Sequence, residues 1–196
     1  MKKRVLMGVM YLAMVALLLG CGKEPVAQID AVKAAVEAAK TAQADVYLQA
    51  DYSALRDSLN AVLANIETQK SKLFKSFGAV KPKLDQVLAQ AGEVAAKTGT
   101  KKEEVKREAE ALMTEIRTVI EENKTLITKA PRGKEGQAVL EQIKAEMTAI
   151  EESLGETQGL LDKGAFMDAL NRLRATNESA KGINTELKDA IAKVKR

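Results

Sequence analysis

Residues 166–194 read FMDALNRLRATNESAKGINTELKDAIAKV, and their apolar side chains recur mostly at steps of three and four residues. The recurring positions are Phe166, Ala169, Leu170, Leu173, Asn177, Ala180, Asn184, Leu187, Ile191 and Val194. This spacing places the side chains along one face of an α-helix, so the stretch predicts a long helix packed against other helices. The two asparagines either set the register of buried helices, as in coiled coils, or mark a face that is not buried.

The same period continues upstream of this helix. One stripe consists of Ile29, Val32, Val36, Ala39, Gln43, Val46 and Ala50, and a second of Tyr52, Leu55, Leu59, Val62, Ile66, Gln69 and Leu73. The second stripe starts out of phase with the first, and Asp51 is a suitable N-cap at the junction. We therefore expect a tight hairpin near residues 49–52. A phase slip within one long helix is the alternative.

Glycine, proline and threonine mark the other helix boundaries. Gly78 is a typical C-terminal stop, and Pro82 suits the first turn of the next helix. Residues 98–100 should end that helix, because Thr100 and Glu103 have the spacing of a capping box for another helix. Further breaks are expected at the loop 129–136 and at the turn 162–164.

Few residues favour strands, since aromatic side chains make up only 3% of the chain. About six helices with short connections predict an all-α fold, either an antiparallel helical bundle or stacked helical hairpins. We expect alanine-rich, coiled-coil-like packing and a single domain at 26–196. The aromatic side chains of this domain should plug the bundle ends: Tyr47, Tyr52, Phe74, Phe77 and Phe166. A ligand platform is the alternative, which a cleft above about 300 Å³ lined by Tyr47, Tyr52 or Phe166 would favour.

The composition excludes several kinds of site. The 196 residues include no His and one Cys, which rules out His-containing triads, Cys-His pairs, His-containing zinc or di-iron sites and intramolecular disulfides. We expect no cofactor, no metal and no enzymatic activity. The net charge of +4 falls to +1, with 28 basic against 27 acidic residues, once Lys2, Lys3 and Arg4 are removed with residues 1–20. Nucleic acid is therefore not an expected partner.

Residues 1–20 have the three parts of an export signal. The basic residues 2–4 precede an apolar run from Val5 to Leu19, and the small Gly20 follows. Fifteen helical residues would reach about 22 Å, which is short of a hydrocarbon core of about 30 Å. We expect a cleaved signal peptide rather than a membrane-spanning helix.

The sequence Leu18-Leu19-Gly20-Cys21 resembles the lipobox of bacterial lipoproteins, in which a leucine three places before the cysteine and a small residue directly before it guide cleavage. The resemblance implies that Cys21 becomes the mature N-terminus and carries lipid on its thiol and amine, with residues 21–25 as a short tether. Gly22 follows the cysteine, which in enteric-type sorting resembles cargo for the outer membrane. A cysteine that merely ends a signal peptide is the alternative.

Acidic residues do not form a convincing catalytic or metal site. The doublets Glu103-Glu104, Glu121-Glu122 and Glu151-Glu152 consist of neighbours that point about 100° apart on a helix, which is typical of solvated faces. Asp30, Asp45, Asp51 and Asp57 lack the spacing and the glycine of a calcium loop. The pair Gly133-Lys134 lacks the other residues of a phosphate-binding loop.

The loop 129–136 concentrates positive charge on Lys129, Arg132 and Lys134. It is a candidate contact for anionic wall polymer or lipid headgroups. The alternative is an ordinary helical hairpin with a lysine favoured by the helix dipole.

The remainder of the chain resembles a group of alanine-rich helical lipoproteins of delta-proteobacteria that carry a domain of unknown function. The resemblance rests on residues 39–47 (AKTAQADVY), 74–77 (FKSF), 129–134 (KAPRGK) and 190–193 (AIAK), and covers most of 24–196. The chain departs from the pattern at 49–52, where an Ala-Pro corner is expected. The resemblance assigns no activity and no site residues.

Together these features predict a lipid-anchored helical protein facing the periplasm, which acts as a scaffold, spacer or adapter toward an envelope protein or peptidoglycan. The outer membrane is the expected location, with the inner membrane and the cell surface as alternatives. The alternative function is a helical module that binds a small apolar or anionic ligand or a cell-wall polymer. Alanine-rich seams could also join subunits into a homo-oligomer.

Overall fold

The computed structural model describes residues 23–194, except the side chains of residues 134, 135 and 194. The expected signal peptide and Cys21 lie outside this range. The described residues form helices and no strand: α2 (Val26–Thr41), α3 (Ala44–Tyr47), α4 (Gln49–Lys70), α5 (Lys81–Lys129), α6 (Lys134–Asp162) and α7 (Phe166–Val194). The predicted all-α fold of about six helices is confirmed. Within 23–194, no helix combines the length and the apolar character needed to cross a membrane.

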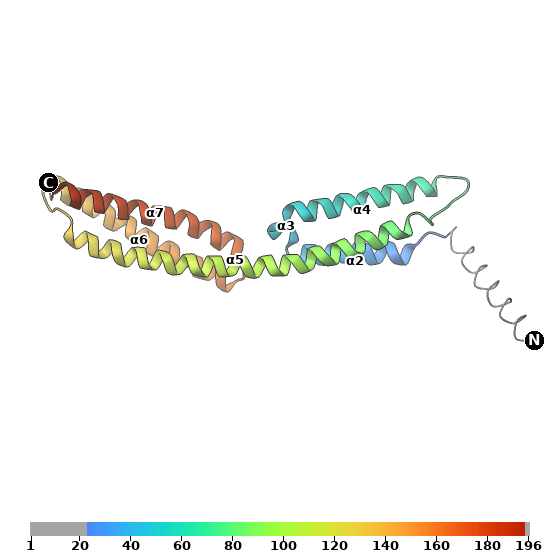
Figure 1. Ribbon diagram of the computed structural model, residues 1–196, viewed down its shortest axis with the longest axis horizontal. Helices are drawn as coiled ribbons and strands as arrows, with labels where there is room; N and C mark the ends of the chain where they lie inside the picture. The colour runs from blue at the N-terminus through green and yellow to red at the C-terminus, as the bar shows by residue number, and fades with distance from the viewer. Residues whose placement is uncertain (1–22, 195–196) are drawn as a thin grey trace, which may run out of the picture. The chain divides into compact units, whose positions relative to one another are not determined.

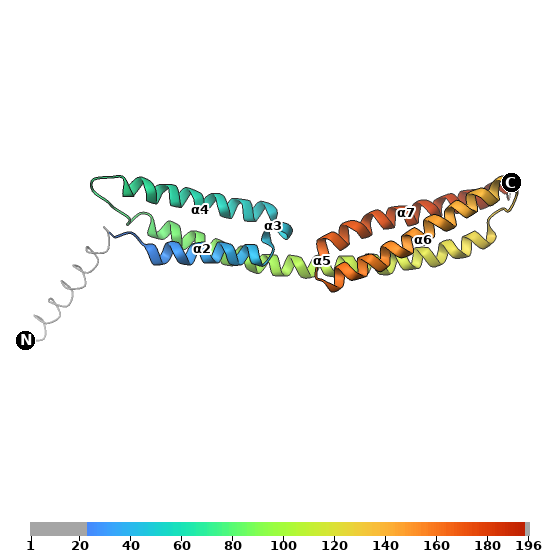
Figure 2. The same cartoon turned by 180° about the vertical axis from the view of Figure 1, so that it is seen from behind.

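The region 26–196, which we expected to be one domain, consists of two compact units. Unit 1 extends to Lys101 and unit 2 begins at Lys102, so the boundary lies inside α5. Figure 1 shows α2 and α4 beside the first part of α5, and Figure 2 shows α6 and α7 beside the last part. Each unit is therefore a three-helix bundle, and α5 contributes one segment to each of them.

Hydrogen bonds and ion pairs define the helix directions in unit 1. Lys70 at the end of α4 pairs with Glu24 just before α2, so these two helices are antiparallel. Gln28 near the start of α2 donates to Asp85 near the start of α5, so these two helices are parallel. The core between them consists mainly of valine, leucine, isoleucine and alanine: Ile29, Val32, Val36, Ala39, Ala44, Leu55, Val62, Ile66, Val80, Leu84, Val87, Ala91 and Val94.

The first corner lies at residues 42–48, upstream of the predicted position at 49–52. Gln43 adopts a left-handed conformation with φ of 72°, which ends α2. The single turn of α3 follows, and α4 has already begun at Gln49. Asp51 therefore lies in the first turn of α4 and is not its N-cap. The predicted hairpin is present, but its predicted position is wrong. The left-handed turn is made by Gln43, a residue type that rarely adopts this conformation.

The predicted break at residues 98–100 is wrong, because α5 is one continuous helix of 49 residues that includes this segment. The Thr98 hydroxyl donates to the Val94 carbonyl, and the Thr100 hydroxyl donates to the Ala96 carbonyl. Both threonines thus bond back along their own helix and do not cap a new one. Gly99 costs a helix only about 1 kcal/mol relative to alanine, too little to stop it between good helix formers.

The helix end expected at Gly78 is wrong, because α4 ends eight residues earlier at Lys70 and residues 71–80 connect it to α5. The remaining boundaries agree with the sequence. Pro82 lies in the first turn of α5, and residues 130–133 connect α5 to α6. At the end of α6, Gly164 has φ of 75°, the Gly164 N–H donates to the Leu161 carbonyl and the Ala165 N–H to the Leu160 carbonyl. This pair of bonds is a Schellman motif, in which glycine takes the left-handed position.

The five aromatic residues at 26–196 differ in how far they are buried. Tyr47, Tyr52 and Phe77 are buried near the corners, as predicted. Phe166 is half-buried at the start of α7, with Lys102 and Lys106 within 6 Å of its ring centroid at 5.9 and 5.7 Å. Phe74 is 87% exposed. The prediction that it plugs a bundle end is wrong.

Candidate functional site

The N-terminal tether is fixed to unit 1 at its last residues. The Glu24 carboxylate lies 2.6 Å from the Lys70 ammonium, Pro25 is buried, and its carbonyl accepts from the Ile29 N–H. Hydrogen bonds with Glu24 and then Glu67 raise the pKa of Lys70 above its ordinary value. The chain leading from residue 21 therefore enters the bundle at a defined place, where α2 starts and α4 ends.

The predicted cationic loop occupies residues 130–133, with Lys129 in the last turn of α5. Lys129 and Arg132 are exposed, whereas the side chain of Lys134 is outside the description. Beside this loop lies an open, largely apolar cleft of about 420 Å³. Its lining is Ala130, Pro131, Gly136, Val139, Leu140, Ile143, Glu186, Leu187, Ala190 and Lys193. Sequence patterns pointed to the charges here but not to the apolar cleft.

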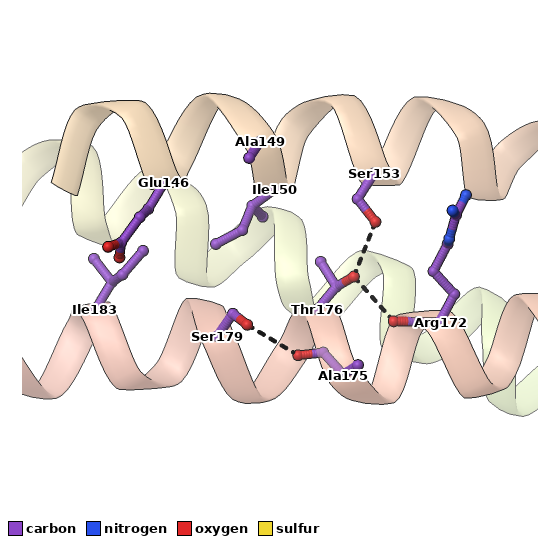
Figure 3. A pocket seen from close by; sticks show the side chains of 9 residues that line it. All are labelled: Glu146, Ala149, Ile150, Ser153, Arg172, Ala175, Thr176, Ser179 and Ile183. Atoms are coloured by element: carbon purple, nitrogen blue, oxygen red, sulfur yellow. Dashed lines mark hydrogen bonds between the residues drawn. The ribbon is translucent and has the colours of Figure 1, made fainter. Parts of the chain in front are cut away.

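A second groove of about 410 Å³ runs between α6 and α7 (Figure 3). Ser153 and Thr176 are hydrogen-bonded across it at 3.1 Å, and Thr176 and Ser179 each donate to a carbonyl one turn earlier. At its rim, Arg172 pairs with Glu156 at 2.6 Å and Glu146 accepts from Gln142. Because each polar side chain lining this groove already has a protein partner, the groove is a seam between two packed helices.

Two further clefts are lined by the aromatic residues proposed as ligand platforms. Tyr52 lines an open cleft of about 520 Å³ at the first corner, together with charged residues from α2, α3 and α4. Phe166 lines one of about 440 Å³ between α5 and α6. Both volumes exceed the threshold of about 300 Å³ named above for a ligand site, and polar or charged side chains make up most of the lining of both clefts.

Members of two of the acidic doublets form ion pairs with lysine. Glu121 and Glu151 both contact Lys124, at 2.8 and 2.9 Å. Hydrogen bonds with Glu121 and then Glu151 raise the pKa of Lys124. Asp30, Asp45, Asp51 and Asp57 are all exposed. Across residues 23–194, no cluster of three or more His, Cys, Asp or Glu side chains could hold a metal ion.

A ladder of ion pairs joins α5 to α7. Its three steps are Glu108 with Arg174 at 2.6 Å, Glu115 with Lys181 at 2.6 Å and Glu122 with Lys188 at 2.9 Å. Each pair is separated by 66 residues and successive pairs by seven, so the two helices run parallel in one heptad register. Hydrogen bonds from Lys181 and then Asn177 lower the pKa of Glu115. The hydrogen bond from Lys188 lowers the pKa of Glu122 against partial desolvation, with help from Asn184.

A buried polar layer lies beside this ladder. Asn123 is 0% exposed; its amide donates to the Ala180 carbonyl at 2.9 Å and approaches the Met147 sulfur at 3.7 Å. Its carbonyl accepts from Asn184 at 2.8 Å. Asn123 therefore links all three helices of unit 2. Asn184 is buried, whereas Asn177 is only half-buried and its carbonyl oxygen has no partner.

Asn123 was missed in the sequence because it lies among charged residues. The available signal was its heptad spacing, seven residues after Ile116 and fourteen after Ala109, which are both buried. No family model, curated protein or solved structure matches the chain.

Proposed function

We propose that the protein is a lipid-anchored, non-enzymatic helical spacer or scaffold that faces the periplasm. The observation that carries the proposal is the fixed entry of the tether: Glu24 and Pro25 are held against unit 1, three residues after the cysteine of the lipobox-like sequence. A lipid on Cys21 would thereby hold one end of a bundle at the membrane surface.

The helices of unit 2 suit a spacer. Each of α6 and α7 has 29 residues, which corresponds to about 43 Å of helix. The α5–α7 ladder and the Asn123–Asn184 pair specify one register over this length. Such a bundle can present Lys129 and Arg132 to an envelope protein or to peptidoglycan, both proposed partners. The outer membrane remains the proposed location.

The test of anchoring is metabolic labelling with radioactive palmitate. The wild-type chain should incorporate label, Cys21→Ser should lose it, and the control Gly22→Ala should keep it because the lipobox-like residues are intact. An unlabelled wild-type band would overturn the proposal. A crosslink and pull-down with the anchor intact should then recover one envelope protein or a wall fragment.

The alternative function is binding of a small apolar or anionic ligand. The cleft beside residues 130–133 favours it, since its lining is mostly apolar and its two charged residues are Lys193 and Glu186. Its volume of about 420 Å³ lies within the usual range for ligand pockets. A monomer that yields no crosslinked partner but co-purifies with such a ligand would favour this function over the scaffold.

A further inference from the structure

The connection between α4 and α5 exposes two large apolar side chains at its tip. Leu73 is 91% exposed and Phe74 is 87% exposed, whereas the next most exposed large apolar residue, Val26, is at 55%. An apolar pair that stands this far into water on an ordered protein needs an explanation, because single partly exposed side chains are normal and projecting pairs are not.

Both ends of this tip are held by the fold. At the α4 side, the Ser71 N–H donates to the Glu67 carbonyl and its hydroxyl to the Thr68 carbonyl. At the α5 side, Phe77 and Val80 are each only 1% exposed, and the Val80 N–H donates to the Phe77 carbonyl. The fold thus buries Phe77 and leaves Phe74, three residues earlier, projecting from the bundle.

The charged residues within the segment that carries the tip are all lysines, and the carboxylates of Glu24 and Glu67 are paired with Lys70 at its α4 end. Residues 68–84 read TQKSKLFKSFGAVKPKL and contain five lysines and no acidic residue. Lys72 and Lys75 directly flank the apolar pair, and both are exposed. An apolar tip between lysines matches a phospholipid surface, where the acyl region takes the apolar side chains and headgroup phosphates meet the ammonium groups.

The tip also lies at the end of unit 1 where the tether enters. Lys70, three residues before Leu73, contacts Glu24 at 2.6 Å. Cys21 is three residues before Glu24, so its Cα lies within about 11 Å of the Glu24 Cα in any chain conformation. Figure 1 shows the 71–80 connection and the start of α2 at the same end of this bundle.

We propose that Leu73 and Phe74 insert into the same membrane that holds the lipid on Cys21, with Lys72 and Lys75 at the headgroups. This inference rests on the proposed lipid anchoring. Unit 1 is then held at two points, the acylated N-terminus and the 71–76 tip. Two contacts fix how the helices of unit 1 leave the membrane, whereas a single point of attachment would leave the bundle free to rotate about it.

The chain contains no tryptophan, so Phe74→Trp supplies a unique fluorophore at the tip. The full-length variant is purified with its lipid and reconstituted into vesicles of phosphatidylethanolamine and phosphatidylglycerol. The indole emission should shift to shorter wavelength, become quenched by brominated acyl chains and lose its quenching by iodide. The control Val46→Trp, at a residue of α3 that is 48% exposed and lies at the other end of unit 1, should show none of these changes.

The outcomes separate the two proposals when palmitate label is measured on the same preparation. A labelled protein whose Phe74→Trp indole stays open to iodide overturns membrane insertion and leaves anchoring intact. An unlabelled protein overturns both. An emission shift that depends on protein concentration without vesicles identifies a second copy of the chain as the occupant and also overturns insertion.

Phosphatidylcholine vesicles separate the two contributions to insertion. If the lysines contribute, the iodide protection should be weaker on this neutral surface than on the phosphatidylglycerol surface, and salt should weaken it only on the latter. A variant with Leu73→Ser and Phe74→Ser should keep its fold by circular dichroism, because both side chains are exposed, and should keep its palmitate label.

Discussion

The substitution Asn123→Ala tests the buried polar layer of unit 2. It removes two hydrogen bonds, the one to the Ala180 carbonyl at 2.9 Å and the one from Asn184 at 2.8 Å. Each contributes about 1 kcal/mol net, and the buried Asn184 amide that loses its acceptor adds about 1 kcal/mol or more. We expect a loss of about 3 kcal/mol in the free energy of unfolding of unit 2.

The assay is urea unfolding in a Phe166→Trp background, which gives unit 2 its own fluorescent reporter. With an m-value of about 2 kcal/mol/M, the loss corresponds to a midpoint lowered by about 1.5 M. The matched control is Asn177→Ala, which changes the same residue type one heptad before Asn184 on α7. It removes an unpaired carbonyl oxygen and one long, exposed hydrogen bond of 3.4 Å to the Glu115 carboxylate.

The control should shift the midpoint little, and the double variant Asn123→Ala with Asn184→Ala should cost less than the sum of its single changes. Equal midpoints for Asn123→Ala and Asn177→Ala would refute the reasoning. The buried hydrogen bonds of Asn123 would then contribute no more to stability than the half-buried side chain of Asn177.

Three further predictions concern the ion-pair ladder and two glycines. Lys181 and Lys188 lower the folded-state pKa values of Glu115 and Glu122. The two ion pairs therefore stabilise the fold fully above the unfolded-state pKa of about 4.3, and this stabilisation is lost as pH falls through the folded-state pKa values. The thermal midpoints of wild type and of Glu115→Gln with Glu122→Gln should therefore converge below about pH 4, and a constant gap down to pH 3 would contradict this. Gly136→Ala should destabilise unit 2 in the same urea assay by about 1 kcal/mol, since its Cβ would lie 2.6 Å from the Pro131 carbonyl oxygen and overpacking outweighs the gain in helix propensity. Gly99→Ala, with nothing within 4 Å, should instead stabilise α5 by about 1 kcal/mol, and circular dichroism showing a loss of helix would contradict a continuous α5.

Sequence periodicity predicted the helical class and the boundaries that rest on strong local signals. Pro82 and Gly164 lie where their backbone preferences place them, at a helix start and in a left-handed turn. Weaker local signals gave wrong predictions. Gln43 takes a left-handed conformation that its residue type does not predict, so the predicted corner lies several residues too late in the chain.

The break expected at 98–100 failed for a different reason. A capping box requires the threonine to leave the helix, whereas Thr98 and Thr100 satisfy their hydroxyls on carbonyls of the preceding turn. Local motifs cannot tell these two arrangements apart, because the choice depends on the packing of both flanking segments. The same limit hid Asn123, whose burial depends on α6 and α7.

The candidate site was only partly accessible from the sequence. The charges of the 129–134 loop could be identified from composition, but the apolar cleft beside it is assembled from α6, α7 and the loop. Phe74 was assigned to a bundle end on the strength of its aromatic ring. Residues 71–80 are not helical, so the three-residue spacing of Phe74 and Phe77 does not place both rings on one face, and the fold buries only Phe77.

The most direct test of the account is the mass of the N-terminal peptide of the protein extracted from bacterial membranes. If Cys21 is lipid-anchored, the peptide begins at Cys21 and carries a diacylglyceryl group and an amide-linked acyl chain. A mature chain that begins at another residue, or one that begins at an unmodified Cys21, would contradict the lipid anchoring.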